Sequence, residues 1–240
     1  MTVYDLFVLQ IISHILSDFF FQTDRWAKDK IKKGVRSKFI KIHLLITFIL
    51  SWIFSFQVLF IAASFVIAGL HILFDVIKLK ITFKYKFFAD QLMHVAVITL
   101  CVYLYYNIAG INPIFRLSLS TYYLIIAAGY LICLKPSNIL IREILNVYNI
   151  KVENNEGIMN AGKLIGVTER IISLTFLLYG IPEAVGFVIA GKSILRFRDT
   201  DTTKTEYVLV GTLLSFTVAI LIGVAINILK NQFLIPLSTP

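Results

Sequence analysis

Histidine and aspartate recur four residues apart in the N-terminal part of the chain. The sequence reads HILSD over 14–18, HILFD over 71–75 and DQLMH over 90–94. Residues four apart lie on one face of an α-helix, about one turn apart, so each pair can address a single centre. His43 adds another imidazole and completes the set of 4 histidines in the chain.

These residue types are ligands for a divalent cation. Imidazole and carboxylate ligands without thiolates suit Zn²⁺, with Mn²⁺ and Fe²⁺ as alternatives. We expect one centre or a dinuclear site, with Gln22 and Gln91 either as hydrogen-bonding neighbours of the ligands or as simple helix caps. The predicted metal ligands are His14, Asp18, His43, His71, Asp75, Asp90 and His94.

Composition identifies the kind of element that must position these residues. Hydrophobic residues make up 58% of the 240 residues and charged residues only 15%, whereas a soluble domain has about 25% charged residues. The mean hydropathy is +0.82. Backbone groups in lipid must be hydrogen-bonded within each segment, so we predict an all-α, polytopic transmembrane helical bundle.

Apolar runs bounded by charged or turn residues predict about eight membrane helices. We expect residues 1–110 to form a four-helix membrane domain with the His and Asp residues, and residues 111–240 to supply the other helices. Behind Pro136, apolar and polar residues alternate at helical spacing, which predicts an amphipathic helix on the membrane surface near 136–150. The predicted spans are 3–22, 38–55, 58–78, 87–107, 117–134, 163–181, 183–198 and 206–229.

The distribution of basic residues predicts the orientation of these helices. Most of the 23 Lys and Arg residues fall in four alternate connections, 24–41, 78–86, 135–163 and 192–204. The positive-inside rule then places these connections in the cytoplasm and both termini outside. At 1.5 Å of rise per residue, all the candidate ligands fall within about three turns of the cytoplasmic boundary.

This common depth strengthens the case for a metal. An ionisable side chain well inside a span costs on the order of 3 kcal/mol, and a bound cation relieves both that cost and the repulsion between carboxylates. Two readings without a metal compete. Each His could be an ordinary interfacial residue and each Asp a hydrated one, or the group could be a proton relay.

The His and Asp segments also carry a family resemblance. HILSDFFFQTDRWAKDK (14–30), then His43, HILFDVIK (71–78) and FFADQLMH (87–94) resemble the bacterial membrane family known as domain of unknown function 3307. The resemblance covers roughly residues 5–100, and segments 135–145, 162–170, 191–197 and 206–216 look similar to the C-terminal halves of longer members. The residues that it carries over are His14, Asp18, Gln22, His43, His71, Asp75, Asp90, Gln91 and His94.

The resemblance implies an activity and a location. The family is similar in its His and Asp pattern to membrane-bound metal-dependent hydrolases, which implies hydrolysis at the membrane surface. It also implies an integral, multi-pass protein of the bacterial cytoplasmic (inner) membrane. Nothing in the second half of the chain matches a hydrolase motif.

Our leading hypothesis is a metal-dependent hydrolase of a lipid or lipid-linked substrate at the cytoplasmic face. Asp18 or Asp75 would be the general base or a further ligand, and His43 would orient the substrate or close a dinuclear site. The first-choice ligands are His14, His71, Asp90 and His94. The alternative is a metal-ion or proton transporter, which we disfavour because the outer halves of the first four helices offer few polar residues. A scaffold with a structural metal is a third hypothesis.

Charged residues elsewhere indicate partners. We expect anionic membrane lipids along the basic segment 24–41. We expect no nucleic acid, because the net charge of +9 comes without an aromatic and basic groove pattern. In the last three helices, charges of both signs favour ion pairs, while Lys192, Arg196 and Arg198 could hold a lipid phosphate. The sequence leaves open whether the chain forms a homo-oligomer.

Overall fold

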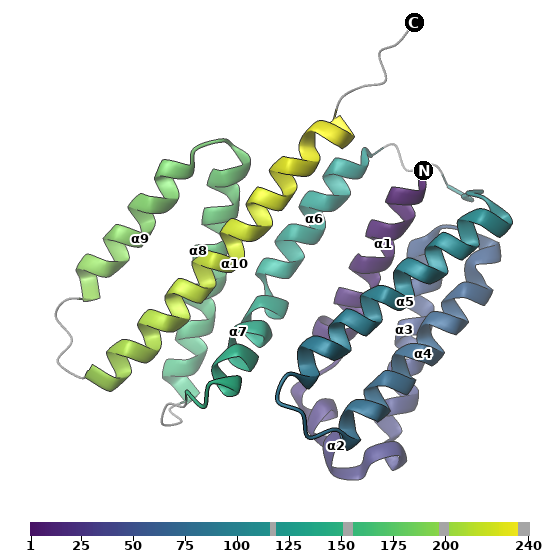
Figure 1. The fold of residues 1–240 in the computed structure, drawn as a ribbon, viewed down its shortest axis with the longest axis horizontal. Helices are drawn as coiled ribbons and strands as arrows, with labels where there is room; N and C mark the ends of the chain where they lie inside the picture. The colour runs from purple at the N-terminus through teal and green to yellow at the C-terminus, as the bar shows by residue number, and fades with distance from the viewer. Residues whose placement is uncertain (116–118, 151–155, 197–201, 235–240) are drawn as a thin grey trace, which may run out of the picture. The chain divides into compact units, whose positions relative to one another are not determined.

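The structure is a computed structural model that describes residues 1–115, 119–150, 156–196 and 202–234, except the side chains of 156–161, 194–196, 202–208 and 234. Within these ranges the chain is all-α and contains ten α-helices (Figure 1). Contacts divide the chain into two compact units, unit 1 (Met1–Leu124) and unit 2 (Ile125–Pro240).

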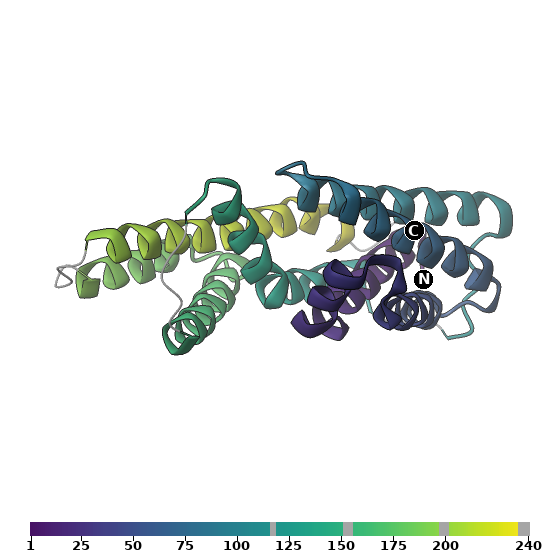
Figure 2. The same cartoon turned by 90° about the horizontal axis from the view of Figure 1, so that it is seen from below.

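Unit 1 is built around four long helices. α1 packs against α3 and α5, α3 packs against α4, and α4 packs against α5, which closes a ring of four (Figures 1 and 2). A short helix, α2, links α1 to α3 at one end of this ring, which we call the α2 end. The elements are α1 (Val3–Ile15), the π-helix η1 (Leu16–Phe21), α2 (Asp24–Lys33), the 3₁₀ turn η2 (Gly34–Arg36), α3 (Lys38–Ser55), the 3₁₀ turn η3 (Val58–Phe60), α4 (Ile61–Lys80) and α5 (Lys86–Ala109).

Hydroxyl side chains begin the first three α-helices. Thr2 accepts a hydrogen bond from the backbone N–H of Asp5, whose carboxylate accepts from the Thr2 N–H in return, and this forms a capping box. Thr23 caps α2 and Ser37 caps α3 in the same way, by accepting from a backbone N–H in the first turn. The Thr23 cap sets where α2 starts, and the Ser37 cap sets where α3 starts.

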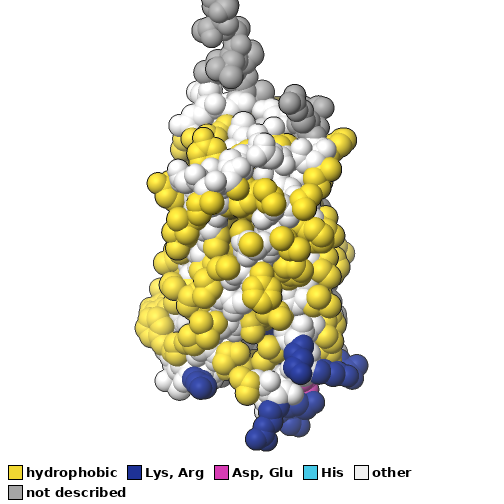
Figure 3. Space-filling model, turned by 90° about the vertical axis from the view of Figure 1, so that its right-hand side faces the viewer, with side chains coloured by type: hydrophobic (Ala, Val, Ile, Leu, Met, Phe, Trp, Pro, Cys, Tyr) yellow, Lys and Arg dark blue, Asp and Glu magenta, His cyan; other side chains and the backbone are white. Residues whose placement is uncertain are grey.

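The exterior of unit 1 is apolar. Large hydrophobic side chains such as Ile53, Phe65 and Leu100 are exposed, and in Figure 3 hydrophobic side chains cover the middle of the visible face while Lys and Arg gather at one end. A soluble protein rarely exposes so large an apolar surface. The helices of unit 1 are therefore suited to lie in lipid.

Length and hydropathy give five candidate membrane spans among the described residues. They are Val3–Phe21, Lys38–Ser55, Val58–Lys80, Lys86–Ala109 and Leu209–Phe233. A sixth arises if α6 (Thr121–Cys133) and α7 (Lys135–Val147), which bend by 50° at their junction, form one broken span. Several long apolar helices thus indicate a multi-pass membrane protein, and the orientation of the termini stays a prediction.

The eight predicted spans are corrected to these five or six. All the predicted helices exist, but α9 (Pro182–Arg196) has only 15 residues, and α8 (Glu156–Leu178) contains Glu169 and Arg170 in its interior. Within the part of the chain that the structure describes, neither helix is among the candidate spans. The amphipathic segment expected near 136–150 is α7, which continues from α6 after the bend.

Unit 2 packs α8 against α9 and α10 (Thr202–Leu234), and α10 also contacts α7. The bend between α6 and α7 is held by Arg170 of α8, whose side chain is 1% exposed. Its guanidinium donates to the carbonyls of Cys133 and Leu134, to Asn138 Oδ1 and to Ser215 Oγ. Carbonyls at a helix C-terminus carry partial negative charge, so they compensate this buried cation without a carboxylate.

Candidate metal centre

The four long helices of unit 1 each contribute one histidine to a cluster near the α2 end. His14 comes from α1, His43 from α3, His71 from α4 and His94 from α5, and each is at most 6% exposed. Asp18 lies in the π-helix that extends α1. Single π-helical turns frequently mark functional sites, because the wider turn displaces a side chain from the ordinary helical position.

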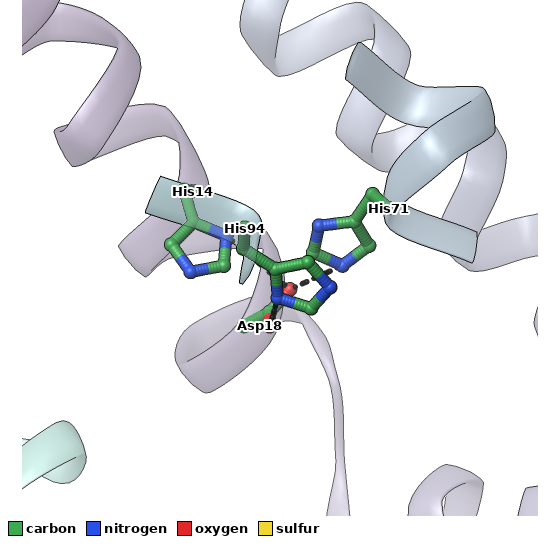
Figure 4. A group of neighbouring side chains, drawn as sticks. All are labelled: His14, Asp18, His71 and His94. Carbon is green, nitrogen blue, oxygen red and sulfur yellow. Dashed lines mark ion pairs between the residues drawn. The ribbon is translucent and has the colours of Figure 1, made fainter. Parts of the chain in front are cut away.

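Asp18 occupies the centre of the four imidazoles. Its Oδ1 lies 2.9 Å from His71 Nε2 and 3.3 Å from His43 Nε2. Its carboxylate is also 3.9 Å from Nδ1 of His14 and 3.9 Å from Nδ1 of His94. Figure 4 shows His14, His71 and His94 around this carboxylate, with dashed lines for the close pairs.

The ligand atoms are close enough for one cation. In the set His14, Asp18, His71 and His94, one ligand atom from each residue lies within 4.8 Å of every other. In a tetrahedral Zn²⁺ site, two ligands that each lie about 2 Å from the ion are about 3.3 Å apart. A contraction of at most about 1.5 Å between these atoms would therefore bring them into coordination range.

Several buried ring nitrogens of the cluster have no hydrogen-bond partner among the described residues. Nδ1 of His14, Nδ1 of His43 and both ring nitrogens of His94 make no hydrogen bond to the residues that the structure describes. An unsatisfied buried polar atom costs about 1–3 kcal/mol. A cation that accepts lone pairs from these nitrogens removes that cost, so the buried His and Asp groups could hold a metal ion.

Two lysines neutralise the other carboxylates. Lys30 Nζ of α2 lies 2.6 Å from Asp75 Oδ2, and Lys78 Nζ lies 3.2 Å from Asp75 Oδ1 and also pairs with Asp90. Lys30 is buried, although it belongs to the most basic segment of the chain. Three aspartates against two lysines leave one negative charge, on Asp18. We expected all three carboxylates to be neutralised by metal, whereas Asp75 and Asp90 have lysine partners and Asp18 has only imidazoles near it.

The structure places the remaining predicted ligands at the edge of this centre. Two further groups have ligand atoms within 4.8 Å, namely His43, His71 and Asp75, and Asp75, Asp90 and His94. Both groups depend on Asp75, whose two oxygens pair with the lysines. A second cation would have to compete with these ammonium groups.

Of the two predicted glutamines, Gln91 contacts the cluster. Its Oε1 lies 3.2 Å from His14 Nε2, a distance at which it accepts a hydrogen bond and fixes the ring. This leaves Nδ1 of His14 directed to Asp18. Gln22 follows η1 as its C-cap residue, four positions after Asp18.

The predicted lipid-phosphate residues lie in unit 2. Lys192 Nζ is 2.6 Å from Glu169 Oε1, which confirms the expected ion pair and leaves less of its charge for a phosphate. Arg198 lies outside the described residues, and the side chain of Arg196 is outside them as well.

The basic segment forms a surface hollow beside α2. Arg25, Lys28, Lys32 and other residues line a pocket of about 340 Å³, and Trp26 stacks on Phe39 with ring centroids 5.1 Å apart. Within it, hydrogen bonds from Lys33 and Ser37 lower the pKa of Asp29. Most of the lysine and arginine charge around this hollow remains available to an anion.

One premise of the sequence analysis is wrong. We expected few polar residues in the parts of the first four helices that lie away from the α2 end. The structure instead buries a series of hydroxyl and amide side chains there, namely Gln10, Thr47, Ser51, Ser55, Gln57 and Ser64. A single Ser or Thr in an apolar run does not indicate a buried polar group, so these residues were not predicted. The spacing of four along α3 is nevertheless visible in the sequence.

A protein-family model matches the part of the chain that contains the cluster. Residues 6–121 match the family described as Protein of unknown function (DUF3307), so the chain carries a DUF3307 domain that includes the whole His and Asp cluster. Comparisons with curated proteins and with solved structures give no match.

Proposed function

We propose that this protein is a metal-dependent hydrolase that acts on a lipid or lipid-linked substrate at the cytoplasmic face of the bacterial inner membrane. The observation that carries the proposal is the convergence of four imidazoles, one from each long helix of unit 1, on the one carboxylate of the cluster that no lysine neutralises. His14, Asp18, His71 and His94 would hold the cation, for which Zn²⁺ is the first choice and Mn²⁺ or Fe²⁺ the alternatives.

The bound cation would supply Lewis acidity, which activates water and polarises the bond to be cleaved. The protein's own residues would position the reactants. His43 Nε2 lies between Asp18 and Asp75, at 3.3 and 3.8 Å, where it can orient a substrate group. With Asp18 bound to the cation, Asp75 is the candidate for the general base.

Positive charge at the α2 end supports an anionic substrate. The side chain of Lys78 is 28% exposed while its ammonium group contacts Asp75 and Asp90, so positive charge lies close to the surface beside the cluster. The hollow beside α2 adds further lysines and an arginine. Each such charge contributes about 1 kcal/mol near an anionic membrane surface. A phosphorylated or otherwise anionic head group is therefore the favoured part of the substrate.

Hydrolysis in reconstituted vesicles tests this proposal. The full chain, incorporated in phosphatidylethanolamine and phosphatidylglycerol vesicles, is offered a panel of lipid phosphoesters and acyl esters, and the released products are measured by mass spectrometry. We expect product release that a chelator stops and that added Zn²⁺ restores, and no release by Asp18→Asn. Release that is unaffected by both the chelator and Asp18→Asn, or no release from any substrate, would contradict the proposal.

A further inference from the structure

One face of α3 is polar and buried over its whole length. His43, Thr47, Ser51 and Ser55 lie four residues apart, and they are the buried residues of this helix. The apolar side chains of α3, such as Leu45 and Ile53, are exposed instead. Packing alone does not need such a polar stripe, because apolar residues would fill the same space without the cost of burying hydroxyl groups.

A small cavity adjoins the histidine cluster on the side away from α2. Its volume is about 10 Å³, close to the minimum that a single water requires. Thr47 lies in its wall, 3% exposed, and Thr47 Oγ1 makes no hydrogen bond to the described residues. His94 also lines the cavity, and its ring nitrogens are likewise unpartnered there. The lining is thus polar and offers a water the partners that it needs.

A hydrogen-bonded group closes the cavity on its far side. Gln10 Nε2 donates to the Ser51 carbonyl at 2.8 Å, and Ser51 Oγ lies 2.7 Å from Gln10 Oε1 and 3.1 Å from Ser64 Oγ. All three side chains are at most 2% exposed. A hydroxyl group can donate one hydrogen bond while it accepts another, which is the property that a proton relay uses.

A second polar group lies one helical turn further along α3. The Ser55 hydroxyl accepts from the Gln57 N–H, and Gln57 Oε1 accepts from the Tyr105 hydroxyl at 3.1 Å. Gln57 is 1% exposed, and its Nε2 has no partner among the described residues. Ser51 and Ser55 are separated by about 6 Å along the helix axis. Polar groups therefore follow one another from the histidine cluster to the opposite end of unit 1.

We propose that this stripe is a proton path that connects the histidine cluster with the end of unit 1 opposite α2. Thr47 and the cavity form its inner part, Gln10, Ser51 and Ser64 form its narrowest part, and Gln57 forms its outer part. Ser and Thr at helix interfaces usually only allow close packing and hydrogen-bond to the neighbouring helix. Packing, however, does not account for a buried Thr47 hydroxyl without a partner beside a cavity. The path conducts protons whether or not the cluster hydrolyses a lipid.

Proton flux into vesicles tests the path. The full chain is reconstituted in phosphatidylethanolamine and phosphatidylglycerol vesicles that contain a pH-sensitive dye, and a potassium gradient with valinomycin drives the flux. Thr47→Val keeps the shape and removes the hydroxyl group, while Ser51→Ala breaks the Gln10 and Ser64 contacts. The matched control is Thr99→Val, which removes a hydroxyl group from an exposed position of α5.

We expect wild type and Thr99→Val to conduct alike, and both path variants to conduct about tenfold more slowly, which corresponds to about 1.4 kcal/mol in the barrier. The metal content of the same preparations should be unchanged, because neither Thr47 nor Ser51 is a proposed ligand. Flux no faster than in protein-free vesicles, or equal flux in Thr47→Val and wild type, would overturn the path and leave the metal proposal intact. If Thr47→Val does not fold, Ser51→Ala decides by the same criteria.

Discussion

Replacement of Asp18 by Asn should remove most of the metal affinity, because Asp18 provides the only charge in the cluster that no lysine neutralises. Its carboxylate lies within 3.9 Å of a ring nitrogen of every histidine. Loss of a neighbour of the ligands typically lowers metal affinity 10–100-fold, so loss of an anionic ligand should reach at least about 100-fold, or about 2.7 kcal/mol.

The matched control is the double variant Lys30→Met with Asp75→Asn. It also removes a buried carboxylate from the cluster, but it removes the ammonium group 2.6 Å away at the same time, so the net charge is unchanged. Replacing both partners of a buried pair by neutral residues is often close to neutral for stability. We expect this variant to bind metal within about threefold of wild type, since the remaining ligands are intact.

Competition with a chelating dye in detergent measures both dissociation constants. Circular dichroism of the same samples shows that the variants are folded. If Asp18→Asn bound metal as tightly as wild type, or if the double variant lost as much affinity as Asp18→Asn, the assignment of the charge to Asp18 would be refuted.

Three further changes probe the surroundings of the cluster and the rest of the chain. Lys30→Met alone should lower the free energy of unfolding by about 3 kcal/mol, because Asp75 loses a buried partner. A thermal melt in detergent measures this loss, and the melting temperature should recover when Asp75→Asn is added. Arg170→Met should lower the free energy of unfolding by a similar amount, since it leaves several buried acceptors of unit 2 without a donor. Its control is Arg142→Met at an exposed position, which should change the melting temperature little. Asp29 has a lowered pKa, so its contribution to stability is present above the usual carboxyl range and is lost as the pH falls below about 4. Asp29→Asn should therefore reduce the acid sensitivity of stability, and equal acid melting curves for this variant and wild type would contradict that account.

Helix positions in unit 1 could be predicted from the sequence because the physical signals there are strong. The apolar runs end at charged residues or turns, and α3, α4 and α5 start and stop close to the predicted residues. The His and Asp spacing of four also predicts that each pair lies on one helix face, because residues at that spacing are about one turn apart. The convergence of side chains from four helices followed from the common depth of these residues.

The lysines of the cluster were not predicted, for two different reasons. Lys78 is three residues after Asp75 on α4, a spacing that favours an ion pair and could have been noticed. Lys30 lies in a segment with so many basic residues that nothing in the sequence distinguishes the one that turns inward. Its burial depends on how α2 packs on the bundle, which is a tertiary property.

The spans in the second half of the chain were harder to predict because charged residues interrupt the apolar runs there. Glu169, Arg170 and Lys192 interrupt apolar runs, and hydropathy alone cannot show that two of them pair with each other and that the third bonds to helix carbonyls. The bend at the α6 and α7 junction depends on that arginine. A prediction of eight uninterrupted spans could not include these tertiary contacts.

The metal content of the purified protein is the most direct test of the central claim. The full chain is extracted in mild detergent without chelators, and divalent metals are quantified by plasma mass spectrometry against the protein concentration. We predict about one divalent ion per chain in wild type and a small fraction of that in Asp18→Asn. Less than about 0.3 ions per chain in wild type, with no gain on incubation with Zn²⁺, would contradict the account.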